Sequence, residues 1–198
     1  MSGKLVLVLG GARSGKSGFA QALAAERAAS QAGVCYIATA SEGDQEMAER
    51  IRHHRAARPR EWMTVELPGG TGLPRLPAAQ VGLLDCFTVY LSNLMACHGL
   101  DWEPQREDEM PEPEVLRRMA LVEDEAMRLV AGLRELPLLI TVSNEVGWGV
   151  VPAYRLGRVF RDLAGRLNQT MARDAAEVYM VVAGLPLQLK GNETRRPA

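Results

Sequence analysis

Residues 4–29 read "KLVLVLGGARSGKSGFAQALAAERAA", and they contain the three parts of a phosphate-binding unit in sequence order. The apolar run at 4–9 predicts a buried strand, and the alanine-rich stretch at 16–30 predicts a helix. Between them, residues 10–17 match the pattern GxxxxGK[ST], which is typical of a P-loop. A strand that runs through such a loop into a helix favours an α/β protein built around a phosphate site.

The residue types of this loop explain how it would bind phosphate. Gly10 and Gly15 allow consecutive backbone N–H groups to turn toward an anion, and the helix that follows adds its positive dipole end. Lys16 supplies positive charge for the β- and γ-phosphates, and Ser17 is a ligand for Mg²⁺. A glycine turn with an accidental Lys-Ser pair is the alternative, but the flanking strand and helix argue against it.

Four further apolar runs lack any alternation of polar and apolar residues, which is typical of parallel strands covered on both faces. The segments between them are long enough for crossover helices. We therefore expect a single domain over residues 1–198, an α/β P-loop (RecA-like) fold with a mostly parallel sheet and helices on both faces. Strands are expected at 34–38, 81–85, 138–142 and 177–183, a weaker strand at 63–67, an antiparallel edge strand after Gly184, and helices at 16–30, 44–57, 112–135 and 154–173.

Composition limits the partners and the location. The 23 basic and 24 acidic side chains nearly cancel, so the chain lacks the long-range attraction to polyanions that nucleic-acid or anionic-membrane binding requires. The longest apolar stretch is well below the ~18 residues of a membrane span, and the N-terminus does not resemble a signal peptide. The three cysteines have no CxxC spacing, which indicates a reducing cytoplasm.

Polar residues follow the predicted strands at the points where those strands end. Asp85 closes the third strand and is the expected carboxylate partner of Ser17 at a Mg²⁺ site. Thr39 and Ser41 follow the second strand, and the pair 144–145 (Asn-Glu) follows the next one along the chain. Open α/β sheets bind ligands at the carboxyl ends of their strands, so these groups are expected at one edge. Taken singly, each is equally typical of a surface turn.

Two of the three histidines are adjacent, in "MAERIRHHRAARP" at 47–59. On the predicted helix, His54 falls about 20° from Met47 on the apolar stripe, whereas His53 projects beside Arg55 and Arg58. A neutral imidazole with cations nearby can act as a nucleophile toward phosphorus. A pair of surface histidines on a basic helix is the other interpretation of the same pattern, and the spacing does not suit zinc.

Several motifs together resemble one family. They are "GGARSGKS" at 10–17, "YIATA" at 36–40, "EMAERIRHHRAARPREWMTVE" at 46–66, "LLDCFTVYLSNLM" at 83–95, "VSNEVGWGVVP" at 142–152 and "FRDLAGRLNQTMA" at 160–172. In this order they are similar to the bifunctional adenosylcobinamide kinase / adenosylcobinamide-phosphate guanylyltransferases of cobalamin biosynthesis. The histidine block is the specific part, because a P-loop alone is common.

The resemblance implies two reactions. The kinase reaction moves the γ-phosphate of ATP or GTP to adenosylcobinamide. The nucleotidyltransferase reaction passes GMP from GTP, through a guanylylated histidine, to adenosylcobinamide phosphate. The family pattern places that histidine at His53 and implies Mg²⁺ and a homotrimer. The catalytic residues are then His53 and Lys16, the metal ligands Ser17 and Asp85, and the nucleotide contacts Gly10, Gly11, Ala12, Arg13, Ser14, Gly15, Lys16, Ser17, Ala38, Thr39, Ala40, Arg55, Ala56, Ala57, Arg58, Glu66 and Asp85.

Two other functions fit part of the pattern. A P-loop small-molecule kinase would use His53 only as a phosphate contact, and a RecA-like ATP-binding module would assemble without turning over a small molecule. Asn144 and Glu145 are weaker candidates for metal or cobinamide contacts, and His98 is expected to be structural. The acidic, proline-rich segment 101–114 is expected to be a solvated excursion or the approach to a helix.

Overall fold

A computed structural model gives the structure of this chain and describes residues 2–40, 52, 58–67, 72–100 and 110–191. The predicted helix at 44–57 and most of the acidic segment therefore lie outside the described residues, apart from Arg52 and residues 110–114. The elements are β1 (Lys4–Gly10), α1 (Lys16–Arg27), the 3-10 helix η1 (Gln31–Gly33), β2 (Val34–Ala38), β3 (Met63–Glu66), β4 (Val81–Asp85), α3 (Phe87–Cys97), α4 (Glu112–Leu133), β5 (Leu138–Asn144), α5 (Arg155–Asp174), β6 (Glu177–Val182) and β7 (Leu185–Lys190).

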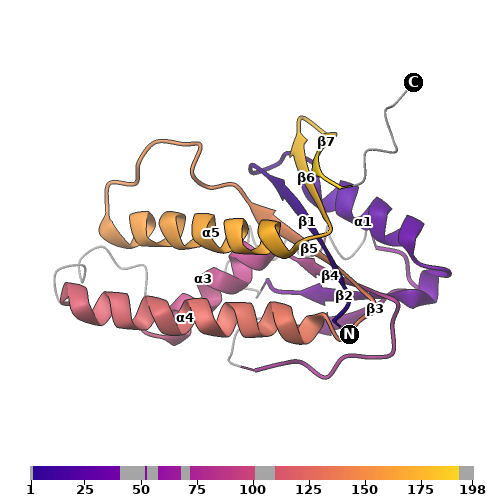
Figure 1. Cartoon of the computed structure of the whole chain (residues 1–198), viewed down its shortest axis with the longest axis horizontal. Helices are drawn as coiled ribbons and strands as arrows, with labels where there is room; N and C mark the ends of the chain where they lie inside the picture. The colour runs from indigo at the N-terminus through magenta and orange to yellow at the C-terminus, as the bar shows by residue number, and fades with distance from the viewer. Residues whose placement is uncertain (1, 41–51, 53–57, 68–71, 101–109, 192–198) are drawn as a thin grey trace.

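One seven-stranded sheet in the order β3-β2-β4-β5-β1-β6-β7 organises these elements. All neighbouring strands are parallel except β6 and β7, which are antiparallel. The chain is thus an α/β protein with a mostly parallel sheet and an antiparallel C-terminal edge, as the apolar runs predict. Helices α3, α4 and α5 cover one face and α1 covers the other (Figure 1).

The central strand β1 explains why the strand runs show no alternation. Leu5, Leu7 and Leu9 pack into the cluster beneath α3, α4 and α5, while Val6 and Val8 pack against α1. Both faces of β1 are therefore buried, and every position from Leu5 to Gly10 is shielded from solvent. Because β1 also runs parallel to β5 and β6, the loop after Gly10 lies at the carboxyl edge of the sheet.

Helix α3 was not expected from the sequence. Its buried residues Phe87, Tyr90, Leu91, Leu94 and Met95 have helical spacing, yet the run directly follows a strand and carries few polar residues to mark the solvent side. A second difference lies at α1, which ends at Arg27 rather than at 30, because Ala28 takes an extended conformation. The 3-10 helix η1 was not expected either, and the other described helices and strands begin and end within about two residues of expectation.

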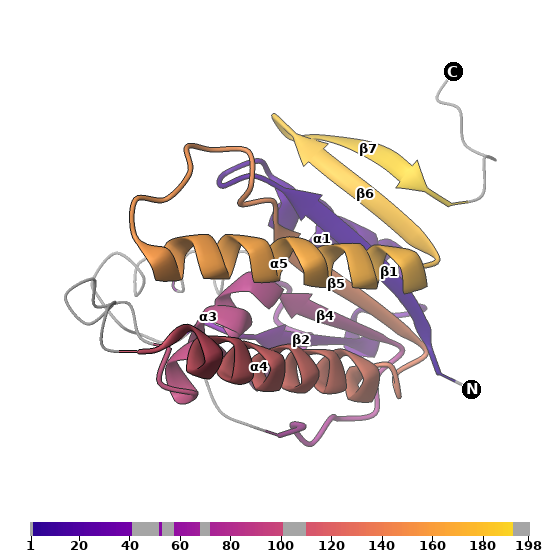
Figure 2. The same ribbon diagram turned by 60° about the vertical axis from the view of Figure 1, so that its left-hand side comes forward.

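The hairpin β6–β7 lies at the end of the sheet beyond α5 (Figure 2). Every residue of β7 is exposed, including Leu185, Leu187 and Leu189. An edge strand with such an apolar row is unusual for an isolated chain. In the described ranges, none of the helices is both long enough and apolar enough to cross a bilayer.

Candidate functional site

The loop after β1 has the shape that a phosphate cradle needs. Gly10 ends β1, where a Cβ atom would stand 2.5 Å from Ser14 Oγ and 2.7 Å from the Val181 carbonyl oxygen, so only glycine fits. Gly15 is the N-cap of α1 with a φ of +92°, in the left-handed region. No side chain caps this helix end, which leaves its N–H groups and dipole available to an anion.

The turn of the β6–β7 hairpin supports the loop from behind. The Gly184 N–H donates to the Ser14 carbonyl at 2.8 Å, and a Cβ on Gly15 would come within 3.1 Å of Gly184 Cα. The Glu145 N–H, just after β5, donates to the Gly10 carbonyl at 3.1 Å. The P-loop is therefore held by the segments that follow both strands flanking β1.

Lys16 is only 8% exposed, and its Nζ donates to the Gly11 carbonyl at 3.0 Å. Burial lowers the pKa of Lys16 below its ordinary value, although Cys86 and Asp85 nearby oppose that shift. A bound phosphate would replace a neutral carbonyl with a full negative charge beside this ammonium. A hydrogen bond from Lys16 to a phosphate oxygen would therefore be stronger than its present bond to the Gly11 carbonyl, which favours anion binding by this loop.

Asp85 stands opposite the loop at the carboxyl end of β4. Its Oδ1 accepts a hydrogen bond from Ser17 Oγ at 3.2 Å, and its Oδ2 accepts one from the Tyr36 hydroxyl at 2.8 Å. Burial raises the pKa of Tyr36 far above its usual range, so this hydroxyl is a donor at neutral pH. The structure therefore brings Ser17 and Asp85 together, and their role as metal ligands stays a prediction.

Three neighbouring strands end in line at this edge. Ala38 of β2 pairs in register with Asp85 of β4 on one side and with Glu66 of β3 on the other. Glu66 is exposed at the end of β3. Thr39 comes next and is fully buried, and Ala40 is the last described residue of this segment. The predicted nucleotide contacts of β2, β3 and β4 therefore share one edge, while Ser41 lies outside the described residues.

Arg58 is the described end of the histidine-containing basic segment. Its guanidinium carbon lies 3.4 Å from the centre of the Tyr36 ring, a close cation–π contact. The other predicted site residues of that segment, His53, Arg55, Ala56 and Ala57, lie outside the described residues, as does His54. Arg58 nevertheless brings the basic segment to the side chain that bonds Asp85.

A second set of polar side chains lies behind Asp85. Thr39 Oγ1 donates to the Cys86 carbonyl at 2.8 Å and accepts from the Cys86 N–H at 2.9 Å. Asn144 Nδ2 donates to Thr88 Oγ1 at 2.6 Å. Asn93 Nδ2 in turn donates to the Thr39 carbonyl at 2.9 Å. These bonds fix the start of α3 against the ends of β2 and β5.

Glu145 has a structural contact in addition to its link with the P-loop. Its Oε1 accepts a hydrogen bond from Asn168 Nδ2 at 3.0 Å, and the same amide donates to the Asn144 carbonyl at 3.1 Å. The Asn168 Oδ1 accepts from the buried Ser143 hydroxyl at 2.7 Å. Asn144 and Glu145 are thus at the expected edge, where they join β5 to α5.

The remaining histidine that the structure describes, His98, caps α3 away from this edge. Its Nε2 lies 3.2 Å from Glu125 Oε2 of α4. This placement agrees with the structural role expected for His98.

Sequence reasoning missed four residues of this edge: Tyr36, Thr88, Asn93 and Asn168. Tyr36 and Asn168 carried a usable signal, because a phenol in an apolar strand and an amide on an apolar helix stripe both require a polar partner. Thr88 and Asn93 lie on the helix that was not predicted, so their position could not be assigned.

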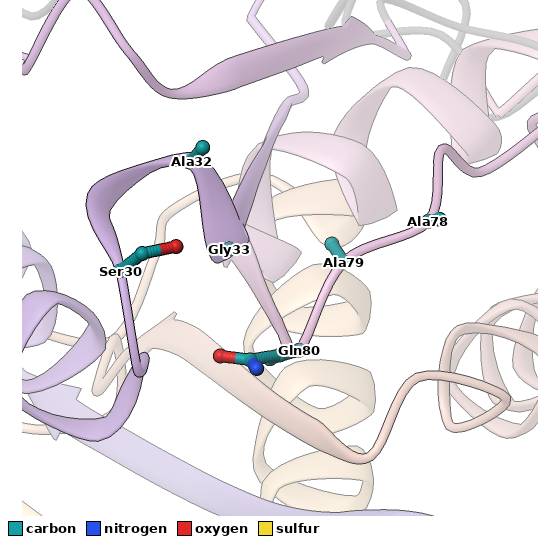
Figure 3. A pocket seen from close by; sticks show the side chains of 6 residues that line it. All are labelled: Ser30, Ala32, Gly33, Ala78, Ala79 and Gln80. Carbon is teal, nitrogen blue, oxygen red and sulfur yellow. The ribbon is translucent and has the colours of Figure 1, made fainter.

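The opposite edge of the sheet has a pocket of about 370 Å³. Figure 3 shows its lining, which comes from the segments before β2 and β4: Ser30, Ala32, Gly33, Ala78, Ala79 and Gln80. The Gln80 Oε1 already accepts from the Ala29 N–H at 2.8 Å. The lining has no charged side chain, and its one hydroxyl, that of Ser30, has no basic or acidic side chain among the lining residues to activate it, so the carboxyl edge is the better candidate for the chemistry.

Comparisons with known proteins show which family the chain resembles. Residues 6–189 match the family model described as cobinamide kinase / cobinamide phosphate guanyltransferase. The bifunctional adenosylcobalamin biosynthesis protein CobP of Pseudomonas aeruginosa is 46% identical over 189 residues, 93% of this chain and 96% of that protein. The proteins named bifunctional adenosylcobalamin biosynthesis protein CobU of Escherichia coli and Salmonella typhimurium are 41% and 40% identical over 192 residues, 94% of this chain and 99% of each.

A solved structure, the flagellar accessory protein FlaH from Methanocaldococcus jannaschii, matches with a TM-score of 0.41 and 13% identity over 96% of this chain and 80% of that one. That likeness is too weak to bear on function. The family match spans residues 6–189, which include the P-loop, Asp85 and the histidine pair, and the three relatives each cover 93% or 94% of this chain. The chain therefore belongs to the cobinamide kinase / cobinamide phosphate guanyltransferase family.

Proposed function

We propose that this chain carries out both reactions of its family. It phosphorylates adenosylcobinamide with ATP or GTP, and it then transfers GMP from GTP, through a guanylylated His53, to adenosylcobinamide phosphate. The product is adenosylcobinamide-GDP. The observation that carries this proposal is that Arg58 of the basic segment and the P-loop meet at one carboxylate, through Tyr36 and Ser17.

The P-loop and Asp85 suit the nucleotide part of this proposal. Residues 10–17 would hold the triphosphate with backbone N–H groups, and Lys16 would balance its charge. The oxygens of Ser17 and Asp85, 3.2 Å apart, are the hard ligands that Mg²⁺ prefers, and this ion typically takes its other ligands from phosphates and water. Among the residues that the structure describes, there is no group of three or more His, Cys, Asp or Glu that could hold a metal ion. When bound, Mg²⁺ supplies positive charge to the transferring phosphates.

The guanylyl transfer proceeds by two displacements at phosphorus. A nitrogen of the neutral His53 imidazole attacks the α-phosphorus of GTP, and the bond to the bridging oxygen breaks with its electron pair leaving on pyrophosphate. A phosphate oxygen of adenosylcobinamide phosphate then attacks the same phosphorus, and the imidazole leaves. Two displacements let one nucleotide site serve two substrates that need not be bound together.

Labelled GTP tests the covalent step. Protein incubated with GTP carrying label at the α-phosphate should retain acid-labile label, and GTP labelled at the γ-phosphate should leave none. His53→Ala should abolish the α-label, whereas the adjacent His54→Ala is the matched control and should keep it. An active kinase without α-label would show instead that the chain is a plain P-loop small-molecule kinase. ATP-dependent assembly without turnover would indicate a RecA-like binding module.

We also propose that the protein is a homotrimer in the cytoplasm, with the acceptor site between subunits. The exposed Leu185, Leu187 and Leu189 of β7 support an oligomer, because such an apolar row favours coverage by another chain. All three cysteines are free thiols, as suits a reducing compartment. Light scattering should give three times the 21.6 kDa chain mass, and Leu187→Lys should lower it. A monomeric wild type would overturn the trimer.

A further inference from the structure

Tyr36 is a side chain with two different ends in contact with two different parts of the site. It lies in the apolar run of β2 and is 1% exposed, so its hydroxyl needs a polar partner within the protein. That partner is Asp85 Oδ2, at 2.8 Å. Ser17 holds the other carboxylate oxygen at 3.2 Å. The carboxylate is thus oriented by a P-loop hydroxyl on one side and by a tyrosine on the other.

The ring of Tyr36 has a separate task. The Arg58 guanidinium lies over it, 3.4 Å from its centre. Arg58 is five positions after His53 in the sequence, so anchoring Arg58 on Tyr36 limits the distance between the proposed nucleophile and Arg58 to the length of about five residues of chain. A planar guanidinium stacks on an aromatic face in a way that neither an aliphatic side chain nor a lysine reproduces.

We propose that Tyr36 is a positioning residue for both reactions, with its hydroxyl orienting Asp85 for the kinase site and its ring anchoring Arg58 for guanylyl transfer. The ring half rests on the proposed guanylyl transfer, and the hydroxyl half rests only on the proposed Mg²⁺–nucleotide site at Ser17 and Asp85. The hydroxyl half concerns the binding of Mg²⁺ with nucleotide, and it would apply equally if this chain were a P-loop small-molecule kinase without guanylyl transfer. The polar contacts of Tyr36 are with Asp85 and Arg58, so we expect it to act through these two neighbours.

The two ends can be removed separately. Tyr36→Phe keeps the ring beneath Arg58 and deletes the hydroxyl, which bonds Asp85 and is also within hydrogen-bonding reach of Arg58. Tyr36→Leu keeps an apolar side chain in the core and deletes both. The matched control is Tyr179→Phe, because the Tyr179 hydroxyl also donates to a carboxylate, Glu177 Oε2 at 2.6 Å, but at the amino end of β6. A tyrosine that only fills the core would tolerate the change to phenylalanine and would affect both reactions alike when truncated.

Binding of a fluorescent GTP analogue at increasing Mg²⁺ concentration tests the hydroxyl. Tyr36→Phe should need about 3- to 10-fold more Mg²⁺ for half-maximal binding, the range that one lost hydrogen bond gives. Tyr179→Phe should bind like the wild type. Equal Mg²⁺ dependence of the two phenylalanine variants would overturn this half of the proposal.

The rate of α-label transfer from GTP to the protein, at saturating Mg²⁺, tests the ring. Tyr36→Phe should label at nearly the wild-type rate, whereas Tyr36→Leu should label about 3- to 30-fold more slowly, the range of a buried cation–π contact. Its kinase rate should fall no further than that of Tyr36→Phe. Equal losses in both reactions would overturn the ring's separate role.

A double-mutant cycle distinguishes loss of the contact between Tyr36 and Arg58 from a general loss of folding. Arg58→Met removes the cation without altering the core, and if Tyr36 acts through Arg58, adding Tyr36→Leu to it should cost no further labelling. Additive losses would contradict the contact. A wild type that phosphorylates its acceptor but never gains α-label would refute the guanylyltransferase proposal, while the Mg²⁺ dependence of Tyr36→Phe would still decide the role of the hydroxyl.

Discussion

The two edges of the sheet contain the same three kinds of group in different arrangements. At the amino edge, Arg27 donates twice to Glu177 at 2.9 and 3.0 Å, and the Tyr179 hydroxyl donates to the same carboxylate. At the carboxyl edge, Tyr36 also bonds a carboxylate, Asp85. There, however, the cation Lys16 is buried and bonds a carbonyl of its own loop. The first edge satisfies its charges internally, and the second is arranged to bind a ligand.

The different burial of the two cations explains why one contributes to stability and the other does not. Arg27 and Glu177 are partly exposed and form a complete ion pair, which contributes modestly to stability. Lys16 loses most of its hydration and gains no full charge as a partner in its hydrogen bond, which costs free energy until a phosphate arrives. A buried lysine that bonds only a carbonyl beside a glycine-rich loop, as Lys16 does, therefore indicates a binding site. The group of Arg27, Glu177 and Tyr179, whose charges pair with each other, indicates a structural role.

The largest expected effect is that of Lys16→Ala. Removal of this ammonium should lower the rate of both proposed reactions by about 10²- to 10³-fold, the range for losing one buried donor to a developing negative charge. The melting temperature should not fall, because the variant no longer buries a lysine whose pKa burial lowers. Steady-state rates and thermal melts would check both statements. A variant that loses stability but keeps its rate would reverse the assignment of this edge.

The second effect is that of Asp85→Asn, which keeps the shape of the side chain and removes its charge. We expect roughly 10-fold or greater loss of affinity for Mg²⁺ with nucleotide, since a neutral amide is a poor ligand for this ion. Mg²⁺ titrations of nucleotide binding would measure it. Glu177→Gln is the matched control at the amino edge and should leave that titration unchanged. If Asp85→Asn and Glu177→Gln needed the same Mg²⁺ concentration for half-maximal nucleotide binding, a metal role for Asp85 would be contradicted.

The sequence allowed much of this carboxyl edge to be predicted because its parts are local. The P-loop pattern lies within eight residues, and Asp85 closes an apolar strand, so both could be assigned from short windows. The fold followed from the unalternating strands, whose burial on both faces is confirmed by Leu7 and Val8. These features require no knowledge of which strands are neighbours.

The missed features depend on neighbours far apart in the sequence. Tyr36 reaches Asp85 because β2 lies beside β4 with Ala38 opposite Asp85, and no local pattern specifies that register. The contact with Arg58 requires the basic segment to return to β2. Helix α3 was missed for a different reason, since its apolar composition hides the solvent face that a helical period would reveal.

A smaller effect is expected from Gly15→Ala. Both Gly15 and Gly99 have positive φ, +92° and +69°, so alanine at either position should cost about 1–2 kcal/mol of folding free energy. At Gly15 the new Cβ meets the backbone of the hairpin turn that supports the P-loop, 3.1 Å from Gly184 Cα, whereas at Gly99 it meets the flexible end of the Arg118 side chain. Gly15→Ala should therefore weaken GTP binding, while Gly99→Ala should destabilise without doing so. Calorimetric titration together with urea unfolding would separate the two results.

The smallest effect is that of Glu177→Gln at the amino edge. Partial burial raises the pKa of Glu177, but the hydrogen bonds from Arg27 and Tyr179 outweigh it and lower the pKa overall. A carboxyl with a lowered pKa stabilises the fold above its unfolded pKa of about 4.3, and it loses that contribution as the pH falls through the folded value. The variant should be less stable than the wild type by at most about 1 kcal/mol at pH 7, with equal activity.

Urea unfolding at a series of pH values would follow this difference. It should stay constant from pH 7 down to about 5 and shrink below that, as the wild-type carboxylate takes up its proton in the unfolded chain and then in the folded one. A difference that grew toward acid pH would mean that Glu177 is held in its neutral form. The amino edge would then resemble the carboxyl edge, because it too would bury a group whose charge is not fully compensated. Lys16 alone would then support the view that the carboxyl edge, and not the amino edge, binds a ligand.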